Sequence, residues 1–265
     1  MFPVLVKIGP LTVHTYGFML ALGVGFGIWF VYVQAKKQGM EANRILDLAF
    51  YTIIISLIGA KAVLFVGNIS FYTRYPSELL SLARSGGVFQ GGLAFGIVFA
   101  ILYMRKHRIP IWKVADIIGP AIALGHGFGR LGCFSAGCCY GRECSVPWGV
   151  TFHNEYAHSI TGIPLGQVVH PVQLYESALN FINFLILFFV LRRKKFDGQV
   201  FFLYIINYSL IRYFTEFYRG DHVLKTYIFK GSSQYLSMSY PQLFCLIGLV
   251  MGLLLFFLIK KRKSA

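Results

Sequence analysis

Long runs of apolar residues alternate with short polar segments along the whole of this 265-residue chain. The runs are continuous rather than alternating in polarity, so they predict helices and not strands. A helix needs about 20 mostly apolar residues to cross a bilayer. Runs of about this length lie at Tyr16–Val33, Leu48–Val66, Val88–Met104, Val114–Phe128, Ser177–Leu191, Val200–Phe217 and Leu243–Ile259. We therefore expect an all-α polytopic membrane protein with seven transmembrane helices, forming a single domain over residues 1–265.

The composition excludes a soluble protein. Hydrophobic residues make up 56% of the chain and charged residues only 13%, whereas soluble domains carry about 25% charged residues. The net charge is +15, which in a soluble chain would point to nucleic acid. Here the basic residues form short clusters between the apolar runs, as in cytoplasmic loops. We therefore expect these clusters to anchor the topology, and we expect no nucleic-acid partner.

Lys and Arg residues are distributed unevenly between the two sides of the predicted bundle. Fifteen fall on the side that contains Arg192–Lys195 and Lys260–Lys263, and eight fall on the other. Because cytoplasmic loops carry the excess of basic residues, the N-terminus is predicted outside and the C-terminus in the cytoplasm. The longest segment between runs, 129–172, then faces outward, and we expect it to form a small head.

Charged residues in two runs are candidates for a binding site. Arg212, Glu216 and Arg219 are spaced i, i+4, i+7, so they share one face of a helix. Charges within a membrane helix normally face a polar interior, but Arg212 and Glu216 could also form only a structural pair. Arg130, in a glycine-rich segment, can grip a lipid phosphate or snorkel to water. The residues alone leave these alternatives open.

Other polar residues lie within runs or at their starts. Lys61 is a cation among apolar residues, and it either contacts a headgroup or snorkels. Paired glycines surround Gln90 in the segment 86–92 and predict a tight re-entrant turn. The segment 170–176 opens the fifth run, and its polar side chains can serve the free backbone amides of that helix start. Tyr16 opens the first run, where an aromatic belt also explains a tyrosine.

Four of the five cysteines fall within twelve residues, at positions 133, 138, 139 and 144, whereas Cys245 lies in the seventh run and is expected to pack there. The spacing matches the paired C-x2–4-C pattern of zinc sites poorly. On the outer side of a bacterial membrane, disulfides form readily. Inert thiols or disulfides, redox-active thiols and metal ligands therefore all stay open for this cluster.

Together these motifs resemble one family, the phosphatidylglycerol–prolipoprotein diacylglyceryl transferases of bacterial plasma membranes. The resemblance rests on Gly129–Gly132 running on to Gly141, on His170–Glu176, on Arg212–Arg219, on Tyr16–Gly17 and on the glycines around Gln90. It covers nearly the whole chain. The best-known members read G-R-x-G-N-F-x-N-x-E-x-x-G in the first motif. Here Cys133, Ala136 and Cys138 replace the two asparagines and the glutamate, and Gln90 stands where those members carry a histidine.

The resemblance implies a reaction near the outer leaflet of the bacterial inner membrane. The thiol of a lipobox cysteine in a prolipoprotein would attack a glyceryl carbon of phosphatidylglycerol, forming a thioether and releasing glycerol phosphate. The implied partners are phosphatidylglycerol, the lipobox segment of the prolipoprotein and membrane lipids. The reaction so described needs no cofactor and no metal.

The resemblance also implies roles for individual residues. Fixed cations stabilise a departing phosphate, and Arg130 and Arg212 suit that task. Gln90 occupies a catalytic position but cannot accept a proton, so His126, one helix turn before Arg130, is our candidate for the base. The residues expected to bind substrate are Arg130, Tyr16, Lys61, Gly91, Gly92, Gly141, His170, Tyr175, Glu216 and Arg219.

Two alternative functions remain at this point. A membrane thiol–disulfide oxidoreductase would use Cys138 and Cys139, and it would lose activity when either thiol is replaced. A non-catalytic phospholipid-binding paralogue would hold phosphatidylglycerol without releasing glycerol phosphate.

Overall fold

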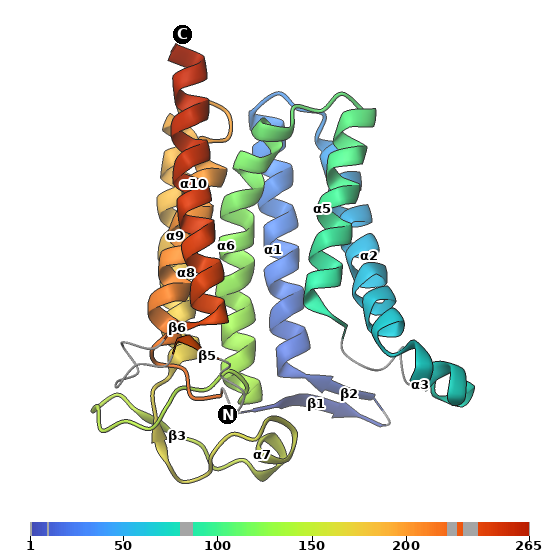
Figure 1. The fold of residues 1–265 in the computed structure, drawn as a ribbon, viewed down its shortest axis with the longest axis vertical. Coiled ribbons are helices and arrows are strands. Elements are labelled where there is room, and N and C mark those ends of the chain that lie inside the picture. The colour runs from blue at the N-terminus through green and yellow to red at the C-terminus, as the bar shows by residue number, and fades with distance from the viewer. Residues whose placement is uncertain (1, 10, 80–86, 222–226, 230–237, 265) are drawn as a thin grey trace. The chain divides into compact units, whose positions relative to one another are not determined.

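The computed structural model describes residues 2–9, 11–79, 87–221, 227–229 and 238–264. Among them, seven helices of 18 residues or more correspond to the seven apolar runs (Figure 1). These are α1 (Thr15–Lys37), α2 (Ala42–Gly67), α5 (Phe89–Lys106), α6 (Ile111–Ala136), α8 (Val172–Arg193), α9 (Gln199–Glu216) and α10 (Tyr240–Ser264). Four of them, α1, α2, α8 and α10, are long and apolar enough to cross a membrane. The prediction of a helical membrane protein is therefore confirmed.

Short elements accompany the long helices. Three two-stranded antiparallel sheets pair β1 (Val4–Ile8) with β2 (Leu11–His14), β3 (Val150–Thr151) with β4 (Val168–Val169), and β5 (Tyr227–Phe229) with β6 (Met238–Ser239). The described residues also include the short helices α3 (Ile69–Arg74) and α7 (Glu155–Thr161), and a 3-10 turn, η1, covers Pro76–Glu78. The apolar runs do not predict these strands, because none is longer than five residues.

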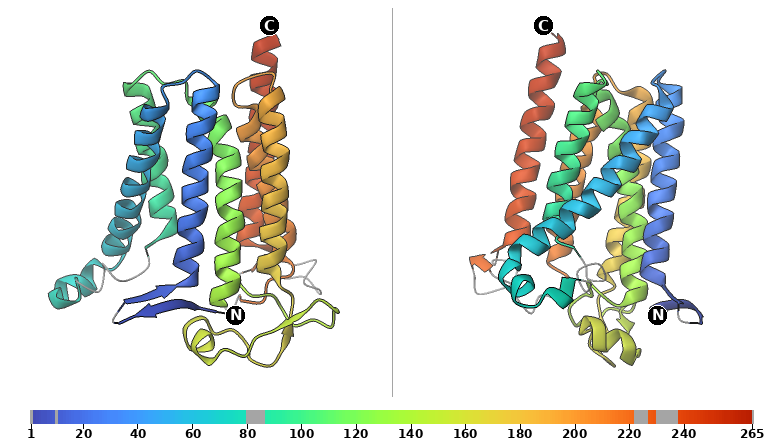
Figure 2. Two further views of the ribbon diagram at one scale, coloured as in Figure 1. Left: turned by 180° about the vertical axis from the view of Figure 1, so that it is seen from behind. Right: turned by 90° about the vertical axis from the view of Figure 1, so that its right-hand side faces the viewer.

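The chain forms two compact units, one of Met1–Phe30 with Ala115–Ala265 and one of Val31–Val114. In the first unit, α6, α8, α9 and α10 run side by side with the beginning of α1 (Figure 1 and Figure 2). The C-terminus lies at one end of these helices, and the segment between α6 and α8 lies at the other (Figure 1). We call this segment, residues 137–171, the head segment.

Helix α6 continues for eight residues beyond Phe128, the predicted end of the fourth run. The apolar pattern ends there because glycines and Arg130 follow, yet these residues keep helical structure. The predicted head, 129–172, therefore begins inside α6. The helix ends before Gly137, whose φ of 80° lies in the left-handed region that glycine adopts without strain. Arg130 and Cys133 are thus carried on a rigid helix rather than on a loop.

The head segment has a small core of its own. Phe152, Ala157, Ile163 and Val169 are buried together there. The side chain of Asn154 accepts a hydrogen bond from the backbone N–H of Ala157 at 2.9 Å and so caps the start of α7. This core holds the chain in a defined path between the end of α6 and the start of α8.

Asp116 joins α6 to the beginning of α9, at the end of the helices away from the head segment. Its side chain is fully buried, and it accepts hydrogen bonds from the backbone N–H groups of Gly198, Val200 and Phe201 and from the ammonium of Lys194, at 2.9–3.1 Å. Amides at a helix start lack partners within the helix, and its dipole favours an anion there. Asp116 thereby holds together the two helices that carry the predicted arginines.

In the second unit, glycines allow α2 and α5 to pack closely. A Cβ atom on Gly91 would lie 2.6 Å from Cγ2 of Val63, and one on Gly92 would lie 2.9 Å from the carbonyl oxygen of Ser56. Contacts this short require a residue without a side chain, as at other membrane helix interfaces. Gly91 and Gly92 therefore have a packing role in this structure, in addition to any contact with a lipid.

The prediction of a re-entrant turn around Gln90 is wrong for residues 89–92. Helix α5 begins at Phe89, so Gln90 lies in its first turn. The backbone N–H of Val88, just before the helix, donates to the carbonyl oxygen of Ala60 at 3.0 Å and ties this start to α2. Gly86, the first glycine of the predicted turn, lies outside the described residues.

Candidate functional site

Arg130 of α6 and Arg212 of α9 meet on one carboxylate, that of Glu176 in α8. The Nε atom of Arg130 lies 2.5 Å from one oxygen of Glu176, and a terminal nitrogen of Arg212 lies 3.7 Å from the other. The hydroxyl of Thr215 also donates to Glu176, at 3.1 Å. The three helices thus bring two guanidinium groups to opposite oxygens of a single carboxylate.

A second carboxylate, that of Glu216, balances the charge of this group. It lies one helix turn after Arg212, whose terminal nitrogen is 2.5 Å from it, and it accepts a hydrogen bond from the hydroxyl of Ser239 at 3.3 Å. Both Glu176 and Glu216 are almost fully buried. Taking charges out of water is costly unless they are paired. We call Arg130, Arg212, Glu176 and Glu216 the charge cluster.

Arg219 lies beyond the end of α9, so it does not continue the helix face of Arg212 and Glu216 as predicted. Its guanidinium instead forms two parallel hydrogen bonds with Asp221, at 3.0 and 2.6 Å. Burial opposes the charge of Arg219, but the hydrogen bonds that it donates to Asp221 and the nearby Cys139 outweigh burial and raise the pKa of Arg219. The residue is therefore a fixed cation.

The backbone of Arg219 pairs with Gly141 in the head segment. A Cβ atom on Gly141 would overlap the carbonyl oxygen of His170. Only glycine fits where these three backbone segments approach. Gly141 therefore allows the head segment to pack closely against the chain at the end of α9, which explains why a glycine stands at this position.

An aromatic group surrounds His170 at the start of α8. Its ring packs edge-on against Tyr218, with ring centres 5.2 Å apart, and its Nδ1 lies 3.3 Å from the hydroxyl of Tyr175. Trp148 donates to the same hydroxyl at 2.7 Å. Burial, reinforced by the positive charge of Arg142, lowers the pKa of His170. The lowered pKa favours the neutral imidazole of His170, which suits hydrogen bonding more than charge pairing.

His126 lies inside the helix bundle between two tyrosines of α9. Its ring stacks on Tyr208 with ring centres 4.9 Å apart, and its Nδ1 lies 3.5 Å from the hydroxyl of Tyr204. The residue sits one turn before Arg130 on α6. Its local environment is thus a hydrogen-bonded aromatic one, on the helix that carries the charge cluster.

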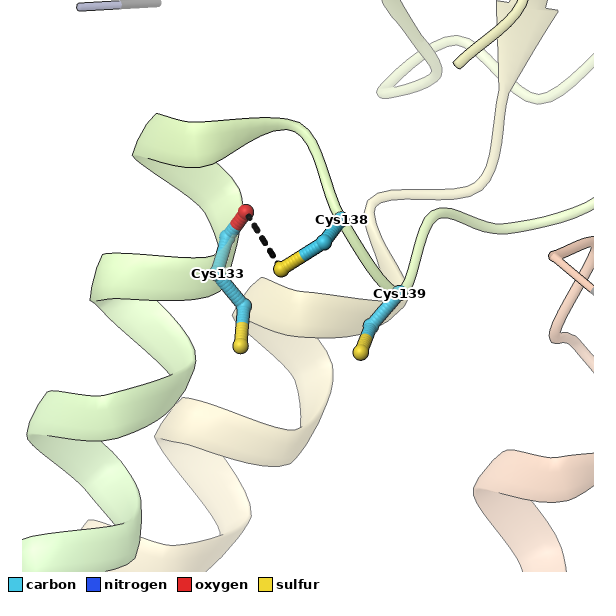
Figure 3. Close-up of side chains that lie close together, drawn as sticks. All are labelled: Cys133, Cys138 and Cys139. Carbon is cyan, nitrogen blue, oxygen red and sulfur yellow. Dashed lines mark hydrogen bonds between the residues drawn. The ribbon is translucent and has the colours of Figure 1, made fainter. Parts of the chain in front are cut away.

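Three thiols gather beside the charge cluster, at the end of α6. The Sγ atoms of Cys133, Cys138 and Cys139 all lie within 4.8 Å of one another (Figure 3), and all three cysteines are free. Cys139 has a φ of 57°, which is uncommon for a residue with a side chain. We call these residues the thiol triad.

The thiols differ in their readiness to ionise. The two neighbouring thiols and the nearby guanidinium groups of Arg219 and Arg130 lower the pKa of Cys139. The neighbouring thiols and burial raise the pKa of Cys138, and the S–H of Cys138 donates to the carbonyl oxygen of Cys133 at 3.8 Å (Figure 3). The guanidinium groups therefore favour a thiolate in the triad.

Comparison with known proteins now decides the family. The family model described as prolipoprotein diacylglyceryl transferase matches residues 3–258. The chain belongs to this family. It is 33% identical over 262 residues to the phosphatidylglycerol–prolipoprotein diacylglyceryl transferase of Clostridium tetani, covering 99% of each chain. The corresponding proteins of Bacillus velezensis and Finegoldia magna are each 32% identical, over 84% and 78% of this chain and over 83% and 79% of the relatives.

These relatives support neither alternative function, oxidoreductase or non-catalytic lipid binder, and this family member is a transferase. Of its predicted site residues, the structure brings Arg130, Arg212 and Glu216 into the charge cluster. Tyr16 lies beside α6, since a Cβ atom on Gly132 would be 3.2 Å from its ring. The predicted residues Lys61, Gln90, Gly91 and Gly92 belong to the second unit of the transferase.

The sequence did not single out Glu176 as the shared partner of the two arginines. From the sequence, we expected the carboxylate of Glu176 to interact with the free backbone amides at the start of α8. A stronger signal was present, since polar residues recur on one face of α8 at Gln173, Glu176, Ser177, Asn180 and Asn183. All five are at most 2% exposed. Such a polar stripe in a membrane helix indicates a buried polar interior.

Replacing Glu176 tests whether it holds the transferase together at this point. We expect Glu176→Gln to reduce the free energy of unfolding by about 3–5 kcal/mol, because Arg130 then stays buried without a counter-charge. Thermal unfolding of the purified protein in detergent measures the effect. Glu155→Gln, an exposed carboxylate on α7, is the matched control and should leave the unfolding temperature nearly unchanged. Equal unfolding temperatures for both variants would contradict the role of Glu176.

Proposed function

We propose that this chain transfers the diacylglyceryl group of phosphatidylglycerol to the thiol of a lipobox cysteine in a prolipoprotein. The transfer forms a thioether and releases glycerol phosphate. Membership of the family and the names of its relatives support this reaction. The observation that carries it is the convergence of Arg130 and Arg212, from two helices, on the buried carboxylate of Glu176.

The two arginines have donors to offer to a phosphate. Each guanidinium carries five N–H donors. Arg130 pairs with Glu176 through its Nε atom. Arg212 pairs with Glu176 and Glu216 through one terminal nitrogen. The remaining N–H groups can grip phosphate oxygens, and such charge-assisted bonds are strong. Because the carboxylates already hold both guanidinium groups, little reorganisation is needed when the lipid binds.

The charge on the phosphate changes during the reaction. Phosphatidylglycerol is a phosphodiester with one negative charge, and breaking the glyceryl C–O bond adds a second charge to the departing group. Fixed cations therefore stabilise the transition state more than the bound lipid, which is the condition for faster chemistry. Arg130 and Arg212 are proposed as the catalytic cations, and Glu176 and Glu216 as residues that position them.

We propose that the residues around the charge cluster bind the substrates. Tyr16, His170, Tyr175 and Arg219 offer hydroxyl, imidazole and guanidinium groups near the end of α6 that leads into the head segment. Gly141 gives the backbone its close approach there. Lys61, Gln90, Gly91 and Gly92 stay predicted contributors to lipid binding from the second unit.

The membrane topology is proposed from the charges and from the arrangement of the first unit. The basic segment Arg192–Lys195 spans the end of α8, at the end of the helices where α10 also ends, and the head segment lies at the opposite end (Figure 1). Basic residues favour the cytoplasmic side. We therefore propose seven spans in the bacterial inner membrane, with the N-terminus and head segment outside and the charge cluster near the outer leaflet.

Replacement of Arg130 tests the proposed function. We expect Arg130→Gln to lower kcat by about 10²–10³-fold, because one fixed donor at the departing phosphate is lost. The assay incubates purified protein with phosphatidylglycerol and a lipobox peptide and follows the increase in peptide mass. Arg193→Gln, an exposed arginine at the other end of α8, serves as the control. Unchanged kcat in the Arg130 variant, or no transfer by the wild type, would contradict the proposal.

The thiol of the substrate must lose its proton, and His126 stays our prediction for the acceptor. Its Nδ1 faces Tyr204, which leaves the second ring nitrogen for another partner. We expect His126→Ala to lower kcat by about 10²-fold, as for other general bases, with the peptide mass as readout. A variant that modifies the peptide as fast as the wild type would remove His126 from the mechanism.

A further inference from the structure

We propose that the thiol triad binds one zinc ion and that the open fourth position of this ion receives the thiol of the lipobox cysteine. This inference rests on the proposed function for its second part, since the lipobox thiol is the substrate of that reaction. Its first part, the metal site, depends only on Cys133, Cys138 and Cys139. It revises the expectation that the reaction involves no metal.

The geometry of the triad suits a small thiophilic ion. Its Sγ atoms lie within 4.8 Å of one another, and they face a common space beside the last turn of α6 (Figure 3). Zinc binds thiolate sulfur at about 2.3 Å, so the sulfurs of a tetrahedral site are about 3.8 Å apart. Small side-chain rotations are enough to close this difference. The spacing of these cysteines along the chain matches the usual zinc pattern poorly, but the folded chain brings three of their sulfur atoms together.

The path of the chain brings the third sulfur into place. Cys133 is the buried member, on α6, and Cys138 and Cys139 follow the left-handed turn at Gly137. The backbone of Cys139 is itself left-handed, with a φ of 57°. The side-chain amide of Gln173 in α8 donates to the carbonyl oxygen of Cys138 at 2.9 Å and holds this turn against the bundle. An odd number of thiols also cannot be consumed by disulfides within the triad.

Three thiolates leave one zinc position unfilled. Structural zinc sites are closed by four protein ligands, whereas catalytic sites keep three protein ligands and an open position. Cys138 and Cys139 are only half-buried, so the triad is reachable from outside. Cys139 lies within electrostatic range of the guanidinium groups of Arg219 and Arg130, which pair with Asp221 and Glu176. A bound zinc with three thiolates would have a net charge of −1, and these guanidinium groups would attract it.

The open position lies next to the proposed phosphate site, and the substrate supplies a soft sulfur ligand. Arg130 is three residues before Cys133 on α6, so both lie on one helix face. A thiol that binds zinc loses its proton. Zinc would therefore supply the thiolate at the position where it is needed.

The chemical step balances without any oxidant or reductant. The lipobox thiol binds zinc and releases its proton to the base or to water. A sulfur lone pair then forms the C–S bond, while the glyceryl C–O bond breaks and its electron pair leaves with glycerol phosphate. The product thioether is a neutral, weaker ligand and leaves the metal, which stays Zn²⁺ throughout.

Metal content tests the site directly. Wild-type protein, purified in detergent without chelator, is expected to contain about one zinc per chain by elemental analysis. Cys139→Ser and Cys133→Ser should lose this zinc. Cys144→Ser is the matched control, since Cys144 is half-buried in the head segment but outside the triad, and it should keep the metal. Zinc-free wild type, equal zinc in all variants, or a disulfide within the triad found by thiol counting would each overturn the site.

Substitution with Co²⁺ tests the open position. The sulfur-to-cobalt absorption bands should change when a lipobox peptide is added, because its cysteine thiol binds the metal. They should not change with a control peptide in which serine replaces this cysteine. Bands that stay unchanged with the cysteine peptide would overturn the role of the metal in binding the substrate thiol.

Removing zinc from the wild type should slow transfer by up to about 30-fold, because a free thiol with a pKa of about 8.5 is only a few per cent ionised at pH 7.

These readouts separate the two proposals. Zinc in the triad without any transfer to the peptide would contradict the proposed function and leave the metal site standing. Transfer that is unaffected by zinc removal and by Cys139→Ser would contradict the role of zinc in binding the substrate thiol and leave the transferase reaction standing.

Discussion

The carboxylate of Glu176 is the constraint on which the rest of the site depends. Two guanidinium groups within one helix bundle would repel each other and lose their hydration. Glu176 forms an ion pair with one guanidinium group through each of its oxygens, and so it ties α6 and α9 to α8. The arginines are therefore held ready before a lipid arrives, and a phosphate meets preorganised donors rather than mobile side chains.

The remainder of the first unit keeps these three helices in register. Asp116 binds the start of α9 to α6 at one end, and Gly141 allows the head segment to pack against the chain after α9 at the other. Polar residues on the buried face of α8 extend the same polar interior between these ends. Contacts at both ends of the helices and between them therefore fix the geometry of the site.

The sequence predicted those features that depend on local patterns. Each long apolar run forms a helix, because a continuous apolar run of this length is a local pattern of helices. Arg212 and Glu216 pair as their spacing of four requires. The extension of α6 to Ala136, the partner role of Glu176 and the thiol triad were not predicted. The partner role of Glu176 depends on contacts between helices far apart in sequence, and the turn that carries Cys138 is held by Gln173, 35 residues away.

The most direct test of the shared site is a double-mutant cycle on lipid binding. The dissociation constant for phosphatidylglycerol would be measured by lipid titration in detergent for the wild type, Arg130→Gln, Arg212→Gln and the double variant. Residues that share a partner show interaction energies of about 0.5–3 kcal/mol. We expect a coupling of at least about 1 kcal/mol, which is about fivefold in the dissociation constant. Effects that add within about 0.3 kcal/mol would show that Arg130 and Arg212 do not act on one headgroup.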